Sequence, residues 1–213
     1  MKTCCTTPIN NKFDLARAKE ELANYLAHGP KKNTLPLLKA VASVELSGAT
    51  ALDIGGGVGA VLFQLLESGA SKAESVDISE AYCAVLQDEL NKRQLHSQVR
   101  IWNGDFLCLK DSIPRRDIVT LDKVICCYEN FEDLVLQSLA KANKWYAYTI
   151  PRDVWWVKLA HFLKEYRVRN RKECFRSFIH PVHAIESLIE QQGFRKHWQG
   201  TKAQWLYTLY QRT

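Results

Sequence analysis

Short apolar runs alternate with amphipathic stretches along most of the chain. The runs that predict buried strands are 50–54, 73–77, 99–102, 117–121 and 145–150. The stretches that predict helices are 13–27, 34–46, 58–66, 79–93, 131–140, 154–166 and 181–192. Strands that alternate with helices are typical of a mostly parallel sheet with helices on both faces.

The C-terminal region departs from this alternation. Two strands are predicted at 194–199 and 204–210, and the Gly200-Thr201 pair between them predicts a β-hairpin that adds one antiparallel strand. We therefore expect an α/β protein with seven strands in one structural domain. Residues 1–48 would form N-terminal helices over a ligand site, and residues 49–213 the core. The insertion around 152–180 is too long for a plain connection and is expected to cap the ligand crevice.

The composition bears on the charge of the substrate and on the cellular environment of the protein. The 213 residues contain 29 Lys and Arg against 23 Asp and Glu, a net charge of +6 that fits an anionic substrate as well as an ordinary basic surface. No signal-peptide pattern or membrane-spanning apolar stretch is present, so a cytoplasmic protein with reduced thiols is expected. The seven Cys include two doublets, Cys4-Cys5 and Cys126-Cys127. Adjacent Cys residues in a strand point to opposite faces, so no metal site is predicted.

The strongest local signal is the segment LDIGGGVGA, residues 52–60. A buried strand runs into Gly55, Gly56 and Gly57, and a helix follows at once. Glycines permit a tight turn and a close approach of the backbone to a ligand, and the start of the helix offers unpaired N–H groups. Gly55, Gly57 and Ala60 also satisfy the dinucleotide pattern GxGxxG/A, so a protein that binds NAD is a competing interpretation.

Asp53 distinguishes a dinucleotide such as NAD from a positively charged cofactor. It lies two residues before the first glycine, where its carboxylate would repel a pyrophosphate and attract a cation. S-adenosylmethionine (SAM) carries an ammonium and a sulfonium group, so the charge arrangement favours SAM. Asp77 and Asp105 follow the next two strands. Each has the alternative role of capping a loop or helix, but three acids at one sheet edge point to a ligand site.

On these residues the sequence resembles the class I SAM-dependent methyltransferase family, with its Rossmann-like sheet. The resemblance covers residues 49–150 and the closing hairpin; SVDIS, NGDF and IVTLDKVICCYEN look like the later family motifs. CCY, YTIPRDVWW and FIHP resemble a bacterial group related to magnesium-protoporphyrin O-methyltransferases. The resemblance implies that glycines flank the methionine portion, Asp77 holds the ribose, and Asp105 with Phe106 lies beside the adenine.

The resemblance also implies that Tyr25 and Gly29 close over the cofactor and that the segment from Asp122 passes near its amino group or sulfur. The expected cofactor-binding residues are Tyr25, Gly29, Asp53, Gly55, Gly56, Gly57, Asp77, Ile78, Asp105, Phe106, Asp122 and Lys123.

The candidate catalytic residues follow the fourth and fifth strands and the insertion. They are Tyr128, Arg152 and His180. Arg152 is expected to orient an anionic acceptor through its planar guanidinium group, and Arg152→Lys would then raise KM or lower turnover. His180 has the alternative role of a capping or packing residue. No single residue stands out as the general base.

The sequence thus predicts a methyltransferase for a small, anionic acceptor that is methylated on O or N. The alternatives are an RNA-directed methyltransferase, an NAD-linked oxidoreductase and a non-catalytic nucleotide-binding protein. A basic run in the insertion fits attraction of an anion, or simply a solvated surface; its members are Lys164, Arg167, Arg169, Arg171, Lys172 and Arg176. No motif of a known RNA-binding module accompanies it, and the oligomeric state stays open.

Overall fold

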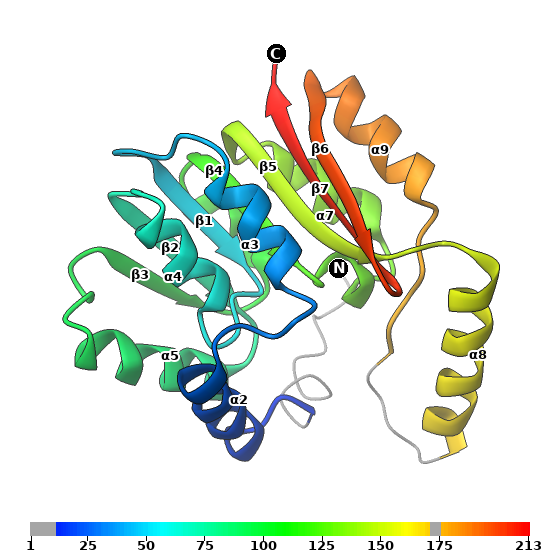
Figure 1. Ribbon diagram of the computed structural model, residues 1–213, viewed down its shortest axis with the longest axis horizontal. Helices are drawn as coiled ribbons and strands as arrows, with labels where there is room; N and C mark the ends of the chain where they lie inside the picture. The colour runs from blue at the N-terminus through cyan, green and yellow to red at the C-terminus, as the bar shows by residue number, and fades with distance from the viewer. Residues whose placement is uncertain (1–11, 171–175) are drawn as a thin grey trace.

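A single seven-stranded sheet organises the computed structural model, which describes residues 12–170 and 176–213. Its strand order is β3-β2-β1-β4-β5-β7-β6 (Figure 1). The strands are β1 (Thr50–Ile54), β2 (Lys72–Asp77), β3 (Val99–Asn103), β4 (Arg116–Asp122), β5 (Ala142–Pro151), β6 (Phe194–Lys202) and β7 (Trp205–Arg212). β7 pairs antiparallel with both β5 and β6, and the strand pairs from β3 through β5 are parallel, which confirms the predicted fold class.

Helices cover both faces of the sheet. They are α2 (Leu15–His28), α3 (Leu35–Ala42), α4 (Ala60–Glu67), α5 (Glu80–Lys92), α6 (Phe106–Leu109), α7 (Phe131–Leu139), α8 (Trp155–Asn170) and α9 (Val182–Gln191). Apolar side chains of α3, α4 and α5 form one core against the sheet, and those of α6, α7 and α9 form a second core on the other face. Burial of these two sets drives the layered arrangement.

Two helices lie outside these layers. The α2 helix packs on α5 through Ala18 and Leu22, which contact Tyr82 and Val85. The α8 helix stands beside the sheet at the end of β5 (Figure 1). No helix in the described residues is long and apolar enough to cross a membrane.

The strand order determines which edge of the sheet carries a crevice. The chain passes from β1 to β2 on one side and later returns to β4 on the other side of β1. At such a point the connections after neighbouring strands diverge and leave a crevice at the carboxyl ends of the strands. The glycine segment after β1 and the acids that end β2 and β4 therefore meet at one edge.

The hairpin differs from the prediction. Gly200 lies inside β6, opposite Tyr207, and the turn falls between Lys202 and Trp205, with Ala203 at a φ of 51°. A Cβ atom on Gly200 would lie 2.7 Å from the indole ring of Trp198. The glycine therefore makes room for Trp198 next to a β-bulge and does not form the turn.

Other element boundaries also shift. The helix predicted at 34–46 ends at Ala42, and β5 begins three residues earlier than expected. The short α6 helix was not predicted because four residues are too few to show a helical period. The α8 helix extends to Asn170, past the predicted end.

Candidate functional site

A cleft of about 1080 Å³ opens at the carboxyl ends of β1, β2 and β4. All the predicted cofactor residues line it: Tyr25, Gly29, Asp53, Gly55, Gly56, Gly57, Asp77, Ile78, Asp105, Phe106, Asp122 and Lys123. Tyr128 lines it as well. Residues separated by about a hundred positions in sequence are thus brought to one concave surface.

The glycine loop forms the inner wall of the cleft. The Gly55 N–H donates to the Val76 carbonyl oxygen at 2.7 Å, which ties the loop to the end of β2. Gly55 has a φ of 69°, and a Cβ atom there would lie 2.3 Å from Val124 Cγ2. Only glycine combines this left-handed backbone with such a close approach, so the turn after β1 requires it.

Asp53 lies beneath this loop and is buried. Because Asp53 pairs with Thr120 in the register of β1 and β4, the Thr120 hydroxyl donates to Asp53 Oδ1 at 2.7 Å. Within the described residues Oδ2 is buried and accepts no hydrogen bond. Burial raises the pKa of the Asp53 carboxyl to about 7, against the opposing effect of the Thr120 bond, and the charges of Asp122 and Asp77 raise it further.

Asp122 forms the second acidic element of the cleft floor. Its Oδ2 accepts from the Thr34 hydroxyl at 2.8 Å and from the Lys123 ammonium at 2.6 Å. Its Oδ1 is buried and has no partner in the part of the chain that the structure describes. Lys123 has a φ of 65°, an unfavourable backbone conformation for a residue with a side chain. The end of β4 is therefore held in a fixed shape by Thr34 and Lys123.

Asp77 organises the loop from the end of β2. Its two oxygens accept from the Gly57 and Ser79 N–H groups, both at 2.9 Å. Burial raises the pKa of the Asp77 carboxyl, while these two backbone bonds lower it. Asp77 thus lines the cleft and also fulfils the capping role that the sequence left open.

Asp105 and Tyr128 form a pair at the opposite side of the cleft. Asp105 Oδ1 caps α6 by accepting from the Leu107 N–H at 2.9 Å, and it also accepts from the Tyr128 hydroxyl at 2.7 Å. Phe106, the next residue, is buried in the core below. The pair fixes the Tyr128 ring against the cleft wall.

Arg152 and His180 do not line this cleft. The Arg152 guanidinium donates to the Ala203 carbonyl oxygen at 3.3 Å and lies over the Trp156 ring. His180 is buried, and its Nε2 is 2.9 Å from the Tyr128 carbonyl oxygen. Burial lowers the pKa of the His180 imidazole, so its neutral form, with Nε2–H as donor, suits this contact. Their predicted catalytic roles gain no support from these positions.

The sequence profile of a family described as "O-methyltransferase domain" matches residues 10–144 of the chain, which is more than half of its length. The chain belongs to this family. It is a methyltransferase, and the predicted resemblance to class I enzymes is confirmed. A comparison with curated protein sequences finds no match.

Solved structures share the fold of the methyltransferase at low sequence identity. Magnesium protoporphyrin IX methyltransferase from Synechocystis PCC 6803, with bound S-adenosylhomocysteine (SAH), has a TM-score of 0.73 and 16% identity over 98% of this chain and 99% of that one. An O-methyltransferase family protein from Burkholderia thailandensis has a TM-score of 0.73 and 12% identity over 96% and 62%. A SAM-dependent methyltransferase from Mesorhizobium loti has a TM-score of 0.62 and 13% identity over 84% and 98%.

The cysteine doublet after β4 differs from the geometry assumed in the sequence argument. Residues 125–127 form a 3₁₀ turn instead of a strand, and both sulfurs face the Lys123 carbonyl oxygen, at 3.3 Å for Cys126 and 3.6 Å for Cys127. Cys127 lines the cleft of the methyltransferase. The described residues contain no group of three side chains suited to hold a metal ion, and Cys4-Cys5 lies outside them.

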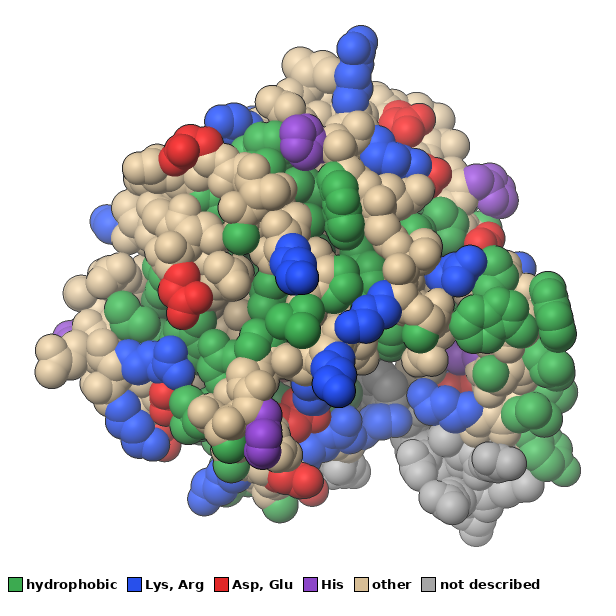
Figure 2. All heavy atoms as spheres, viewed as in Figure 1, with side chains coloured by type: hydrophobic (Ala, Val, Ile, Leu, Met, Phe, Trp, Pro, Cys, Tyr) green, Lys and Arg blue, Asp and Glu red, His purple; other side chains and the backbone are tan. Residues whose placement is uncertain are grey.

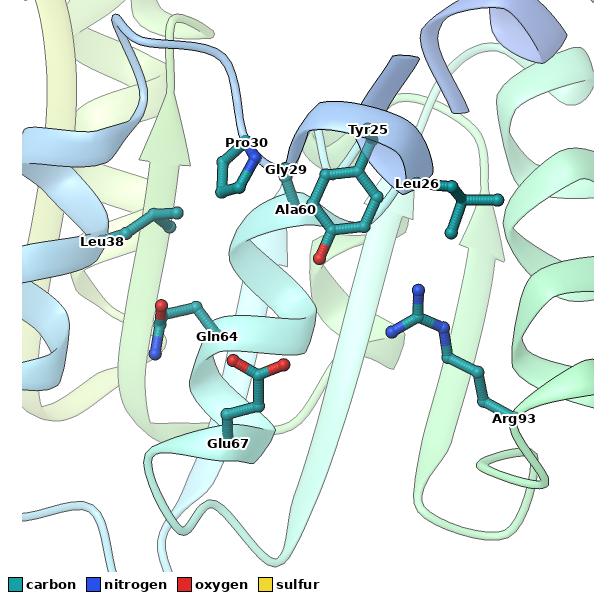
Figure 3. A pocket seen from close by; sticks show the side chains of 9 residues that line it. All are labelled: Tyr25, Leu26, Gly29, Pro30, Leu38, Ala60, Gln64, Glu67 and Arg93. Carbon is teal, nitrogen blue, oxygen red and sulfur yellow. The ribbon is translucent and has the colours of Figure 1, made fainter. Parts of the chain in front are cut away.

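A second pocket of about 300 Å³ is lined by residues of α2, α3 and α4 together with Arg93 (Figure 3), and it adjoins the wall of the cleft. Tyr25, Gly29 and Ala60 belong to both spaces, so this wall is one layer thick there. The Tyr25 ring stacks on Phe63 with 6.0 Å between centroids, and the Arg93 guanidinium lies over Phe63 at 4.1 Å. The contacts with Phe63 and Arg93 hold the Tyr25 ring in place.

Thr34 and Phe178 are among the contributors to the cleft that the sequence argument missed. Thr34 was expected only as the start of a helix, but its hydroxyl binds Asp122 and makes no cap hydrogen bond. Phe178 lines the cleft, and its N–H donates to the Cys126 carbonyl oxygen at 2.7 Å. Thr34 belongs to none of the quoted motifs, and Phe178 begins the FIHP segment but was given no role there, because each residue reaches the cleft through a contact between distant parts of the chain.

Proposed function

We propose that the protein transfers a methyl group from SAM to a small, anionic acceptor on an oxygen or nitrogen atom. The observation that carries this proposal is the pair of buried carboxylate oxygens, Asp53 Oδ2 and Asp122 Oδ1, that lack partners among the described residues at the cleft floor. A buried anion without a partner is costly, so the site suits a cationic ligand.

The residues present fit SAM better than a dinucleotide. SAM supplies an electrophilic methyl group on a positively charged sulfur. The charges of Asp77 and Asp122 both act on Asp53, and this acidic group would repel a diphosphate. Asp53 and Asp122 would hold the positively charged end of the cofactor, the glycine loop its carboxylate, Asp77 the ribose, and Asp105 with Phe106 the adenine.

The size of the cleft supports a second molecule in the same space. Ligand pockets usually measure about 300–1000 Å³, and the cleft reaches about 1080 Å³. The part lined by Cys127, Tyr128 and Glu129 remains for the acceptor. There the Tyr128 ring, whose hydroxyl is held by Asp105 on the adenine side, would form a wall of the acceptor space, and shielding from water would favour direct displacement.

Arg176 takes the place that the sequence argument gave to Arg152. Arg176 lines the cleft near Phe178, whereas Arg152 is directed to the hairpin. A guanidinium group binds a carboxylate or phosphate at two points, which supports an anionic acceptor. His180 then acts as a positioning residue, because its contact with the Tyr128 carbonyl oxygen holds the loop that carries Tyr128.

Titration calorimetry with SAM, SAH and NADH tests the cofactor. We expect SAM and SAH to bind and NADH not to bind; binding of NADH alone would refute the proposal.

Transfer of a labelled methyl group to carboxylate- or phosphate-bearing small molecules then tests the acceptor. Labelled RNA, with no small-molecule product, would favour the RNA-directed alternative. Tight SAH binding without any methylated product would favour a non-catalytic role.

A further inference from the structure

The α8 helix turns a row of large apolar side chains toward solvent. Taken with 100° per residue, they fall within an arc of about 120° on one side of the helix. We call them the α8 apolar face; its members and their exposed fractions are Trp155 76%, Trp156 39%, Leu159 51%, Phe162 66%, Leu163 50% and Tyr166 62%. Figure 2 shows apolar side chains gathered at the edge of the molecule where α8 lies.

The opposite side of α8 attaches the helix to the protein. Val157 is 5% exposed, and His161 Nε2 lies 3.1 Å from the Ser177 hydroxyl. The Glu165 carboxylate accepts from the same hydroxyl at 3.2 Å. The apolar face is therefore not used for these contacts. Contiguous apolar surface of this kind marks an interaction site in soluble domains.

The charge around the face points to an anionic partner. Among the described side chains of α8 there are two Lys residues, Lys158 and Lys164, against one acidic residue, Glu165. Lys158 and Lys164 are exposed, and Glu165 is engaged with Ser177. The Arg152 guanidinium adds a positive charge over the Trp156 ring.

A bilayer fits this combination better than a second copy of the chain. Two copies joined through this face would bring like charges together on molecules that each carry a net charge of +6, which is unfavourable. An anionic bilayer offers apolar acyl chains to Leu159, Phe162 and Leu163 and phosphate groups to the cations. Trp and Tyr are favoured at the boundary between the two. With 16 residues, α8 is about 24 Å long and would lie in the membrane surface.

We propose that the α8 apolar face docks the protein on the surface of an anionic lipid bilayer. The chain that leaves α8 soon reaches the cleft, where Arg176 and Phe178 form part of the lining. Docking would thus involve the insertion next to the cleft, but the proposal does not depend on the methyl acceptor.

Sedimentation with lipid vesicles tests the docking. The full chain is mixed with phosphatidylcholine vesicles, with or without about 30% phosphatidylglycerol, at low and high salt. We expect binding to the anionic vesicles that weakens with salt. The double variant Trp155→Ser, Phe162→Ser should bind about tenfold more weakly or worse, because two exposed aromatic anchors are lost. Lys158→Gln with Lys164→Gln should reduce the preference for anionic vesicles.

The matched control is Leu15→Ser with Leu26→Ser, which removes two apolar side chains of α2 that are 47% and 53% exposed. This control should bind vesicles like the unaltered protein, and circular dichroism should show all variants folded. Absence of vesicle binding, or an equal loss in the control, would overturn the proposal. A dimer in analytical ultracentrifugation that the Trp155→Ser, Phe162→Ser variant abolishes, without vesicle binding, would assign the face to self-association instead.

Discussion

The Asp53 carboxyl group has a pKa of about 7 in the absence of a ligand, well above the ordinary value of 3.8. Because the folded-state pKa is raised, the unfolded chain binds fewer protons between these values, and Asp53 makes the protein less stable as pH rises from about 4 to 7. A cationic ligand reverses this effect by favouring the ionised carboxylate. In the proposed site, Asp53 would thus lower folding stability and strengthen cofactor binding.

We expect Asp53→Asn to weaken SAM binding about 10- to 100-fold at pH 8, since hydrogen bonds to a charged group contribute about 1.5–3 kcal/mol. In the unaltered protein, SAM affinity should rise with pH through about 7, with proton release on binding; the variant should lose most of this dependence. Calorimetry between pH 6 and 8 measures both. Asp111→Asn, at a side chain 88% exposed, is the matched control. Equal affinities of the variant and the unaltered protein would exclude Asp53 from the site.

Cys127 is expected to be the more reactive thiol of the Cys126-Cys127 doublet. The interaction between the two neighbouring thiols lowers the pKa of Cys127, although burial opposes this, and raises the pKa of Cys126. Since the thiolate is the nucleophile, iodoacetamide should modify Cys127 faster than Cys126, and SAH should slow the reaction. Fragment mass spectrometry of the peptide distinguishes the two sites. Faster modification of Cys126 would contradict this assignment.

In the proposed site, the glycine turn between β1 and α4 would bring the backbone close to the cofactor. Gly55→Ala should abolish measurable SAM binding, because a left-handed alanine is strained by about 1–2 kcal/mol and its Cβ meets Val124 at 2.3 Å. Calorimetry measures the binding, and thermal unfolding shows whether the variant folds.

Gly48→Ala is the matched control for Gly55→Ala. Gly48 has a φ of 70°, close to that of Gly55, but a Cβ atom there meets nothing within 4 Å. It should lose stability and keep SAM binding. Adding Val124→Ala to Gly55→Ala should restore part of the binding by relieving the contact. Normal binding by Gly55→Ala alone would show that the turn does not need glycine.

The connection between α2 and α3 is held in place by hydrogen bonds to three distant strands. The Tyr207 hydroxyl in β7 donates to the Asn33 carbonyl oxygen at 2.8 Å, and the Lys202 ammonium in β6 donates to the Lys32 carbonyl oxygen at 2.7 Å. Thr34 binds Asp122 at the end of β4. The C-terminal hairpin thus shapes a cleft wall that begins near the N-terminus.

We expect Tyr207→Phe to weaken SAM binding about fivefold, because one hydrogen bond of about 1 kcal/mol that holds this wall is lost. Tyr146→Phe is the matched control: it removes a hydroxyl bonded to Ser138 at 2.7 Å in a buried contact that does not line the cleft. Its stability should fall while SAM affinity is retained. Equal SAM affinity in the two variants would show that the hairpin does not influence the cleft.

The pattern of residues along the chain was enough to predict the sheet and the inner half of the candidate site. Apolar runs fixed β1, β2 and β4, and the direction of parallel strands brought their terminal acids to one edge, so Asp53, Asp77 and the glycine segment could be placed without coordinates. The positions of Thr34, Phe178, Arg152 and His180 became known from the folded structure alone. These residues sit in connections, and the course of a connection depends on hydrogen bonds to distant elements and not on a local period in its own sequence.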